Sequence, residues 1–318
     1  MQSRTASSKY CVETALTPTT VALGNFDGVH RGHLQVVQAI LPSNLPESVT
    51  DAYPTVVTFD PHPQEFFSGQ KKTLLTTVEE KVTQLRSLGV KQVVVLPFNQ
   101  SLAKLTPQEF VEDILVQKLQ ATCVSVGENF CFGSKRSGTT ADLQTIAAKF
   151  GIEVIVVPLY KCGGDRISSS LIREALLNAN LDTANRFLGR PYPLTGTVVA
   201  GKQLGRTIGF PTANLELPPE KFLPQSGVYC VEILINGQTI ELEPHPLQGV
   251  MNIGNRPTVD GTVTTVEVHI FNWSGDLYGR EITVSLGKFL RSEQKFANLD
   301  ALKNQIAADC QAAKAFFT

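Results

Sequence analysis

Short apolar segments alternate with amphipathic helical segments between residues 20 and 188, and this alternation limits the possible folds more than any other feature of the sequence. Such alternation predicts a parallel, doubly wound sheet, the architecture of Rossmann-like α/β domains. Two helix starts support it: Thr76 with Glu79 predicts a capping box, and Thr106 with Pro107 and Glu109 predicts another cap. The expected strands are residues 20–24, 55–59, 92–96, 123–127 and 153–157.

The pattern changes after Leu188, where closely spaced strand segments with turn residues replace the alternation. This spacing predicts a small antiparallel β-barrel, followed by a closing helix from about Leu299 to Phe316. The segment ELEPHP at 241–246 is expected to be a solvated loop. The barrel strands are expected within 194–200, 227–237, 247–254, 263–271 and 281–290. We therefore expect a flexible tail over residues 1–16, an α/β domain over 17–188 and a barrel domain over 189–318.

Charge and composition argue against several classes of protein. The 318 residues include 28 basic and 29 acidic side chains, so there is no excess positive charge to bind nucleic acid by counterion release. No apolar run approaches the ~18 residues of a membrane span, and residues 1–14 lack the apolar core of a secretory signal. A trimmed targeting remnant is the alternative to a disordered tail.

The six cysteines form no C-x-x-C pair, which argues against a zinc site and favours reduced thiols in a cytoplasmic protein. The oligomeric state is left open.

The segment GNFDGVHRGH, from Gly24 to His33, follows the first expected strand and leads into a helix. His30 and His33 lie three residues apart at the helix start and share one face, and Gly32 between them allows a phosphate to approach the backbone. Imidazoles placed there can hydrogen-bond the charge that develops on a phosphorus atom under in-line attack. A metal pair or a surface cluster is the alternative. The position at the end of the first strand of an α/β sheet favours a nucleotide site.

A second polar segment, ISSSLIR at residues 167–173, begins a later helix. Serines at a helix start usually act as caps, but an arginine one turn inside the helix, together with H-x-G-H, favours phosphate binding. The chain contains neither G-x-G-x-x-G nor G-x-x-x-x-G-K-[ST], so a dinucleotide fingerprint and a P-loop are both excluded. A nucleotide-handling domain without those loops is expected to transfer a nucleotidyl group.

These two segments resemble the nucleotidylyltransferase superfamily, whose hallmarks are H-x-G-H and I-S-S-T-x-x-R. Ser170 stands where the superfamily usually has threonine; it keeps the hydroxyl, so we expect a weakened rather than an absent contribution. If the chain had lost adenylyl transfer, Ser170 and the following Leu171 are the positions where the cause would be expected. The resemblance implies that ATP is bound by Gly24, Phe26, His30, Gly32, His33, Ser168, Ser169, Ser170 and Arg173.

The segment from Gly201 to Asn214 is punctuated by glycines and ends in a polar pair. Glycines allow backbone N–H groups to converge on phosphate oxygens. Thr212 and Asn214, two apart in an extended chain, point the same way and offer neutral oxygens to Mg²⁺. A structured turn without a ligand is the alternative.

This segment, followed in order by GVYCVEI, NIGNRPT, VEVHIF, DLYG and LRSEQKF, resembles the riboflavin kinase family. With the first half, residues 17–318 resemble the prokaryotic-type bifunctional riboflavin kinase/FMN adenylyltransferases, also called FAD synthetases. The resemblance implies that the barrel domain phosphorylates riboflavin with ATP and that the α/β domain adenylylates FMN to FAD, releasing pyrophosphate. It implies a kinase ATP site at Gly201, Gly205, Arg206, Thr207, Gly209, Pro211, Thr212 and Asn214, with Thr212 and Asn214 as the Mg²⁺ contacts.

Flavin is expected at one site in each domain. In the α/β domain, TFDPHP (58–63) and GENFCFGSKRSG (127–138) combine aromatic rings with a basic, Gly-rich turn that suits a planar ring carrying a phosphate. Phe130 and Phe132 could equally belong to the core. The residues implied there are Asp60, Pro61, Asn129 and Phe130.

In the kinase, the resemblance implies Glu267 as catalytic base and flavin contact, and Arg291 as a residue that helps close the flavin site. Strand alternation puts Glu267 and His269 on one face and the apolar residues around them on the other. A surface strand position is the alternative for Glu267. For the whole chain, the alternative is a flavin-binding or kinase-only protein in which adenylyl transfer is weakened.

Overall fold

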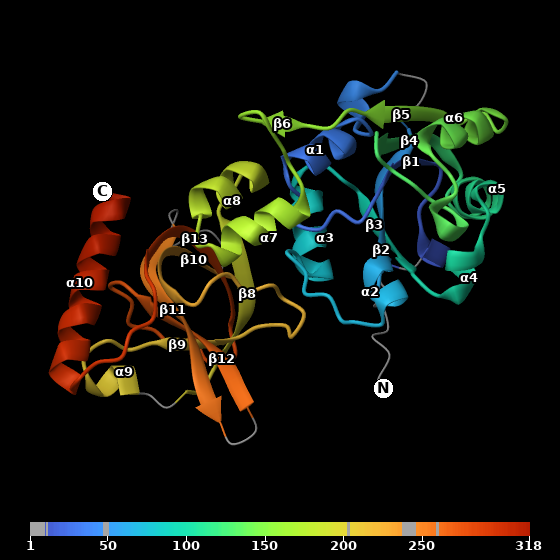
Figure 1. Ribbon diagram of the computed structural model, residues 1–318. Coiled ribbons are helices and arrows are strands. Elements are labelled where there is room, and N and C mark those ends of the chain that lie inside the picture. The colour runs from blue at the N-terminus through green and yellow to red at the C-terminus, as the bar shows by residue number, and fades with distance from the viewer. Residues whose placement is uncertain (1–9, 11, 47–50, 202–203, 237–245, 259–260) are drawn as a thin grey trace. The chain divides into compact units, whose positions relative to one another are not determined.

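The structure, a computed structural model, describes residues 10, 12–46, 51–201, 204–236, 246–258 and 261–318. The chain forms two compact units that divide between Ser169 and Ser170, and each unit has its own sheet (Figure 1). The loop expected at 241–246 lies outside the described residues except for Pro246.

A five-stranded parallel sheet with the order β3-β2-β1-β4-β5 forms the centre of the first unit. The direction of strand progression reverses between β1 and β4, as in doubly wound sheets. The predicted Rossmann-like architecture is confirmed, and each expected strand overlaps an observed one. The strands are β1 (Thr19–Leu23), β2 (Tyr53–Asp60), β3 (Gln92–Pro97), β4 (Ala121–Gly127) and β5 (Glu153–Val157), with β6 (Lys161–Cys162) and β7 (Asp165–Arg166) in a separate pair.

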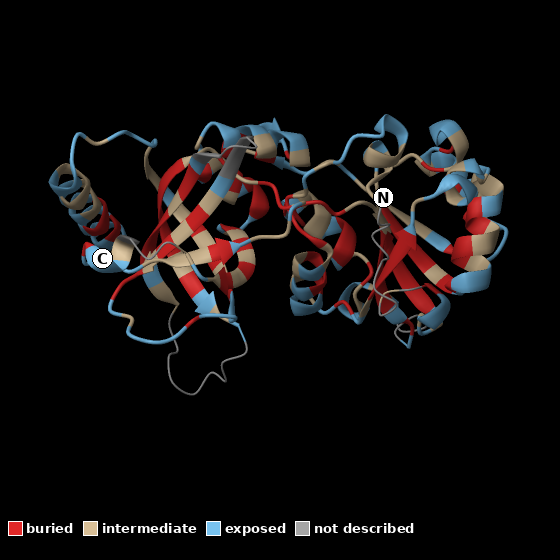
Figure 2. Cartoon of the chain, turned by 90° about the horizontal axis from the view of Figure 1, so that it is seen from below, coloured by how far each residue is buried: buried red, intermediate tan, exposed pale blue. Residues whose placement is uncertain are grey.

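Helices cover both faces of this sheet. In β1, Ala22 joins one hydrophobic cluster with residues of α1 and α3, whereas Val21 and Leu23 join another with residues of η5 and α6. Figure 2 shows the central strands buried along their length, as expected for a parallel sheet covered on both sides. The helices of this unit are η2 (Val12–Thr14), α1 (Arg31–Gln38), η3 (Pro42–Asn44), α2 (Pro63–Ser68), α3 (Val78–Ser87), α4 (Gln100–Lys104), α5 (Pro107–Glu109), the π-helix η5 (Phe110–Lys118), η6 (Ser134–Arg136) and α6 (Thr140–Ala148).

The predicted capping box at the start of α3 is wrong by one residue. It joins Thr77 and Glu80, because the preceding threonine is used elsewhere: the Oγ1 of Thr76 accepts a hydrogen bond from the N–H of Gly28 at 3.0 Å. The cap predicted at Thr106 is confirmed as a capping box with Pro in the first turn.

The segment before β1 packs on the first unit. Val12 is buried in a core cluster. The backbone of Leu16 exchanges two hydrogen bonds with the side chain of Gln92, at 2.9 Å and 2.8 Å. The last residues of the expected tail, which include Val12 and Leu16, are therefore packed. Residues 1–9 and 11 lie outside the described part of the chain.

Six antiparallel strands close into a barrel in the second unit, in the order β10-β11-β12-β9-β8-β13. The predicted antiparallel barrel is confirmed, although β9 is missing from the expected strands. Burial alternates along the barrel strands, most clearly in β8 (Figure 2). The strands are β8 (Tyr192–Val199), β9 (Ala213–Glu216), β10 (Gly227–Ile235), β11 (Leu247–Thr258), β12 (Gly261–Ile270) and β13 (Glu281–Arg291).

Two helices that precede residue 189 pack with the barrel. They are α7 (Ser169–Leu177) and α8 (Leu181–Leu188), and the second of them contacts β8 and β13. The side-chain amide of Asn185 donates to the carbonyl of Leu286 at 3.0 Å and accepts from the N–H of Tyr192 at 2.9 Å. The compact unit thus begins before the composition change at Gly189 that marked the expected boundary.

The closing helix is confirmed as α10 (Leu299–Phe317), which runs beside the barrel (Figure 1). Cys310 and Ala313 on its buried side share a cluster with Val228 and Val250 of the barrel. The remaining helix of this unit is the short α9 (Leu204–Thr207).

Among the described residues, no helix is both long and apolar enough to cross a membrane. The five described cysteines are free thiols, and Cys123, Cys230 and Cys310 are buried. Burial raises the pKa of Cys230 and of Cys310 to about 11, so both stay protonated at neutral pH.

Candidate active sites

The predicted residues of the first unit gather at one edge of the sheet. β1 lies between β2 and β4, and the segment from Gly24 to His33 leaves the carboxyl end of β1. The same edge carries Asp60 at the end of β2 and Asn129 just after β4. Open α/β sheets bind ligands at this edge, at the point where the strand order reverses.

His30 and His33 form a stacked pair at the start of α1. Their ring centroids lie 3.5 Å apart with an interplanar angle of 15°. His30 is the N-cap, and its Nδ1 accepts the backbone N–H of His33 at 3.2 Å. When neutral, an imidazole that accepts at Nδ1 carries its proton on Nε2, which is thereby a donor for a ligand oxygen. The predicted shared face of the two histidines is confirmed.

The backbone of this segment is strained. Phe26 and Val29 have φ of 48° and 41°, a region that side-chain-bearing residues rarely adopt, and both are buried. A Cβ on Gly32 would lie 3.2 Å from Cε1 of His30, so the glycine lets the ring lie close to the backbone. Strain held by a packed core is typical of a preorganised site.

Asp27 anchors the same segment to two others. Its Oδ1 accepts the backbone N–H groups of Leu75 at 2.8 Å and Thr76 at 3.4 Å. Its carbonyl accepts the hydroxyl of Ser169 at 2.8 Å, which brings the ISSS segment to the H-x-G-H loop. The sequence analysis missed Asp27, although it lies inside the GNFDGVHRGH motif.

The other residues implied for adenylyl transfer are placed as follows. Ser168 is half-buried, just before α7, whereas Ser170 is exposed on that helix. Arg173 lies one turn inside α7, where its guanidinium is 5.5 Å from the ring centroid of Phe222 within the second unit. Phe130 packs against a core cluster and stacks with the buried Phe132, and Pro61 is half-buried.

Lys81 is a further polar residue at this edge that sequence analysis missed. It is only 5% exposed, and its Nζ donates to the carbonyl of Asn25 at 2.8 Å and to Oγ1 of Thr58 at 3.1 Å. Burial lowers its pKa from the ordinary 10.5 to about 8, against the opposing effect of Asp27 and Asp60. The helical periodicity of α3 offers no signal that distinguishes this lysine from a surface lysine.

A cavity of about 280 Å³ opens in the second unit, between barrel strands and α10. Five residues implied for the kinase line it, namely Gly205, Thr212, Asn214, Glu267 and Arg291. They come from three separate segments of the chain, namely 201–214, β12 and β13. Other residues of its wall are Asn252, His269, Glu293, Phe296, Ile306 and Asp309.

Glu267 lies between two asparagines on neighbouring strands. It pairs with Asn214 of β9 on one side and with Asn252 of β11 on the other. Val266, Val268 and Ile270 are buried while Glu267 and His269 are half-buried, so the predicted alternation of β12 is confirmed. Directly opposed residues lie close enough for their side chains to interact. One carboxylate and two amides therefore form a row across the cavity wall.

The glycines of the 201–214 segment have a packing reason. A Cβ on Gly201 would lie 2.0 Å from Nδ2 of Asn214, and one on Gly205 would lie 2.3 Å from the carbonyl oxygen of Phe210. These two glycines allow the segment to fold closely around the polar pair. Five of the implied ATP contacts do not line the cavity. One is Gly201, which packs on Asn214. The other four are exposed, namely Arg206, Thr207, Gly209 and Pro211, and Gly209 has φ of 90°.

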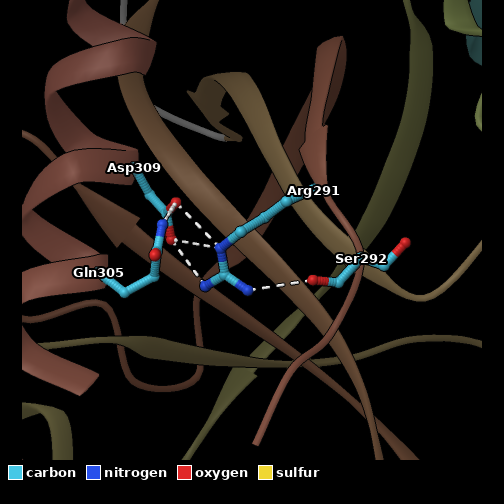
Figure 3. Close-up of polar contacts among 4 residues, drawn as sticks. All are labelled: Arg291, Ser292, Gln305 and Asp309. Atoms are coloured by element: carbon cyan, nitrogen blue, oxygen red, sulfur yellow. Dashed lines mark hydrogen bonds and ion pairs between the residues drawn. The ribbon is translucent and has the colours of Figure 1, made fainter. Parts of the chain in front are cut away.

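His269 and Asp309 hold parts of the cavity wall. Nδ1 of His269 lies 2.8 Å from the carbonyl oxygen of Pro211; because a carbonyl only accepts, this nitrogen donates. Figure 3 shows Arg291 joined to Asp309 of α10, with N–O distances of 2.7–3.1 Å. Gln305 donates to Oδ1 of Asp309 at 2.9 Å. Sequence analysis missed Asp309, which is 6% exposed and lies on a helix expected to be a simple closing element.

Comparisons with known proteins cover both units. The FAD synthetase family model matches residues 12–171, and the riboflavin kinase family model matches residues 188–317. A bifunctional riboflavin kinase/FMN adenylyltransferase from Escherichia coli (strain K12) is 42% identical over 302 residues, covering 93% of this chain and 92% of the relative. A relative of the same description from Haemophilus influenzae is 38% identical and covers 93% and 94%.

A solved structure is also similar. It is described as a macrolide-efflux protein from Streptococcus pneumoniae, and it matches with a TM-score of 0.81 and 30% identity, covering 96% of this chain and 97% of that one. The two family models together match nearly the whole length of the chain. The chain belongs to the family of bifunctional riboflavin kinase/FMN adenylyltransferases.

Proposed function

We propose that this chain makes FAD from riboflavin in two steps, with a kinase in the second unit and an adenylyltransferase in the first. The observation that carries the proposal is that one chain matches both the FAD synthetase family model, over residues 12–171, and the riboflavin kinase family model, over residues 188–317. Riboflavin, FMN, FAD and ATP are therefore its substrates and products. The expected cytoplasmic location belongs to the same proposal, as does the absence of nucleic-acid and membrane partners.

In the kinase step, the ribityl 5′-hydroxyl of riboflavin attacks the γ-phosphorus of ATP, and ADP leaves. Glu267 accepts the hydroxyl proton, a role that suits a carboxylate on the cavity wall. Phosphoryl transfer otherwise depends on alignment and on neutralisation of charge. Arg291, held by Asp309, is the flavin contact from β13.

Mg²⁺ fits the residues present in this cavity. The side-chain oxygens of Thr212 and Asn214 are neutral hard donors on its wall, and Mg²⁺ in nucleotide sites takes few protein ligands because phosphates and water supply the rest. When bound, the ion neutralises charge on the triphosphate. Gly201 packs closely on the side chain of Asn214 and Gly205 lies near that of Thr212, so a side chain at either glycine would disturb these two donors.

In the adenylyl-transfer step, a phosphate oxygen of FMN attacks the α-phosphorus of ATP, and pyrophosphate leaves. His30 donates from Nε2 to the phosphate oxygens, where charge develops, and His33 stacks beside it. The backbone around Gly32 and the hydroxyls of Ser168 and Ser169 supply further ATP contacts in this unit, and the family resemblance assigns such contacts to Ser170 and Arg173 as well. Asp60, Pro61, Asn129 and Phe130 supply the flavin side of the site.

The test is incubation of the purified protein with riboflavin, ATP and Mg²⁺, followed by chromatographic separation of the flavins. The proposal expects FMN to accumulate first and FAD to follow. FMN without FAD would favour a kinase with weakened adenylyl transfer, for which the Ser170 departure is the specific observation. Bound riboflavin without turnover would reject both activities.

A further inference from the structure

Lys81 is a buried cation with no part in the reaction described above. It lies on α3 and is 5% exposed, in a helix whose other buried residues are Val82 and Leu85. Lysine is almost never buried to this extent without a specific partner, because desolvation of the ammonium is costly. Its burial therefore requires an explanation in the contacts of the ammonium.

The ammonium joins two segments of the predicted adenylyl-transfer site. One partner is the carbonyl of Asn25, at 2.8 Å, in the loop that carries His30 and His33. The other is Oγ1 of Thr58, at 3.1 Å, two residues before Asp60 at the end of β2. The hydroxyl of Thr58 also donates to the carbonyl of Asn25 at 3.0 Å, which closes a three-membered network.

Two carboxylates balance the buried charge from the same two segments. Asp27 lies in the loop and Asp60 ends β2, and both oppose the effect of burial on the lysine. On its own helix, the nearest acid, Glu80, is engaged in the capping box with Thr77. A loop acid and a strand acid therefore both favour the charged form of the ammonium, which bonds to the backbone of the loop.

We propose that Lys81 is a positioning residue for adenylyl transfer, whose ammonium fixes the loop bearing His30 and His33 against the end of β2 that bears Asp60. The proposal rests on the function proposed above. Transfer requires the α-phosphorus, held by the loop, to meet the FMN phosphate, whose flavin is held at β2. A misplacement of about 1 Å between reacting groups can cost 10²-fold in rate, so a bond that spans the two segments can matter without touching substrate.

The first test compares Lys81→Met with Lys91→Met in the full-length chain. Lys91 is an exposed lysine just after α3, so its replacement controls for the loss of a charge. Lys81→Met is expected to reduce the kcat/KM of FMN adenylylation by about 10- to 100-fold. Riboflavin phosphorylation by the same preparation is expected to stay within twofold of wild type, as are both activities of Lys91→Met.

A double-mutant cycle with Thr58→Val separates positioning from a general effect on folding. Valine has the shape of threonine without the hydroxyl, so Thr58→Val removes one end of the network and leaves the buried volume unchanged. Thr58→Val also removes the direct bond from Thr58 to Asn25. If the ammonium acts by joining the two segments, the loss in the double variant is therefore expected to be clearly smaller than the product of the two single losses. Effects that multiply fully would show that the two residues act independently and would overturn the proposal.

The pH dependence supplies a readout that a structural role would not produce. Since burial lowers the pKa of Lys81 from 10.5 to about 8, the folded protein releases this proton more readily than the unfolded chain does. Relative to Lys81→Met, wild type should therefore gain stability as pH rises from 8 towards 10.5. A neutral amine is a weaker donor than an ammonium, so over the same range wild type should lose its advantage in adenylyl transfer.

Thermal unfolding at each pH and initial rates of FAD formation from supplied FMN measure the two trends. Opposite trends support positioning, and parallel trends reject it. Near-normal FAD formation by folded Lys81→Met also rejects it. If wild type itself forms no FAD, the proposed function fails; if wild type forms FAD and His30→Ala does not, a normal Lys81→Met overturns only the role of Lys81.

Discussion

The two units build their candidate sites in different ways. In the parallel-sheet unit, the polar residues lie at the carboxyl ends of strands and mostly on the loops that follow, and the central strands are buried on both faces. In the barrel unit, Asn214, Asn252 and Glu267 stand on the strands, side by side across the cavity wall. The first site therefore depends on how loops are anchored, and the second depends on strand register.

This difference decides what disturbs each site. A loop site needs a network such as that of Asp27, Thr58 and Lys81 to hold the backbone in place. A strand site receives its positions from the barrel hydrogen bonds, and a change of one side chain should leave its neighbours in place. The two activities belong to different units. For a variant altered in one unit, the activity of the other unit therefore serves as an internal control.

The largest effect is expected from Glu267→Gln, which tests the strand site. Glutamine keeps the size and most hydrogen bonding but cannot accept the hydroxyl proton, so the kinase rate should fall by roughly 10²–10⁴. Riboflavin binding should survive, and supplied FMN should still be converted to FAD. The measurement is kinase turnover and FMN adenylylation on one preparation. A parallel fall of both would mean that Glu267 maintains the fold, and no fall would mean that another group takes the proton.

The matching change in the loop site is replacement of His30 or His33 by alanine. Loss of one donor to developing charge costs about 2.7–4 kcal/mol in comparable sites, so FAD formation should slow by about 10²–10³. His30→Ala should also lose the N-cap of α1 and be somewhat less stable, whereas His33→Ala should not. Riboflavin phosphorylation by both variants should match wild type. A folded double variant with near-normal FAD formation would contradict the assignment.

The loop site offers a local sequence signal and the strand site does not, for a physical reason. His30, Gly32 and His33 are contiguous, and their place after the first apolar run follows from the alternation of strands and helices. Asn252 and Asp309 become neighbours of Glu267 and Arg291 only through barrel closure and the packing of α10. No local pattern in the sequence indicates such pairings.

The fold was predictable where hydrophobic periodicity is strong, as in the five parallel strands and in α10. β9 was not predicted from the sequence, because Ala213–Glu216 is short and has few β-branched or aromatic residues. Only its pairing with β8 and β12 makes it a strand. The predicted cap of α3 was one residue too early, because Thr76 and Thr77 are locally equally good caps. The contact of Thr76 with Gly28 leaves Thr77 as the cap.

A third prediction concerns the boundary between the two units, which the sequence pattern places after Leu188. A fragment 170–318 should fold and make FMN, because it keeps α8 on the barrel. A fragment 188–318 loses Leu181 and Phe187, which are buried, and the two hydrogen bonds of Asn185. Burial of two such side chains contributes roughly 3–6 kcal/mol before the entropy of ordering the helices is subtracted. The shorter fragment should therefore unfold at lower denaturant concentration. Equal stability would place the boundary at 188 after all.

The smallest effect is expected from Asp309→Asn, which asks whether the strand site needs an anchor as the loop site does. The carboxylate holds Arg291 through three N–O contacts and is itself held by Gln305 (Figure 3). Asparagine keeps the shape and one acceptor but removes the charge, and a charge-assisted hydrogen bond contributes about 1.5–3 kcal/mol. Riboflavin binding should therefore weaken by about tenfold or more, with a smaller change in kcat.

The control is Asp300→Asn, an exposed acid on the same helix, which should bind riboflavin normally. Fluorescence titration of riboflavin gives the affinity, and FAD formation from supplied FMN should be unchanged in both variants. If Asp309 acts through Arg291, the variant Arg291→Ala/Asp309→Asn should bind no more weakly than Arg291→Ala. An additive loss would assign Asp309 a separate role in docking α10. Unchanged binding would mean that the barrel alone holds Arg291, because a strand-borne residue needs no second anchor.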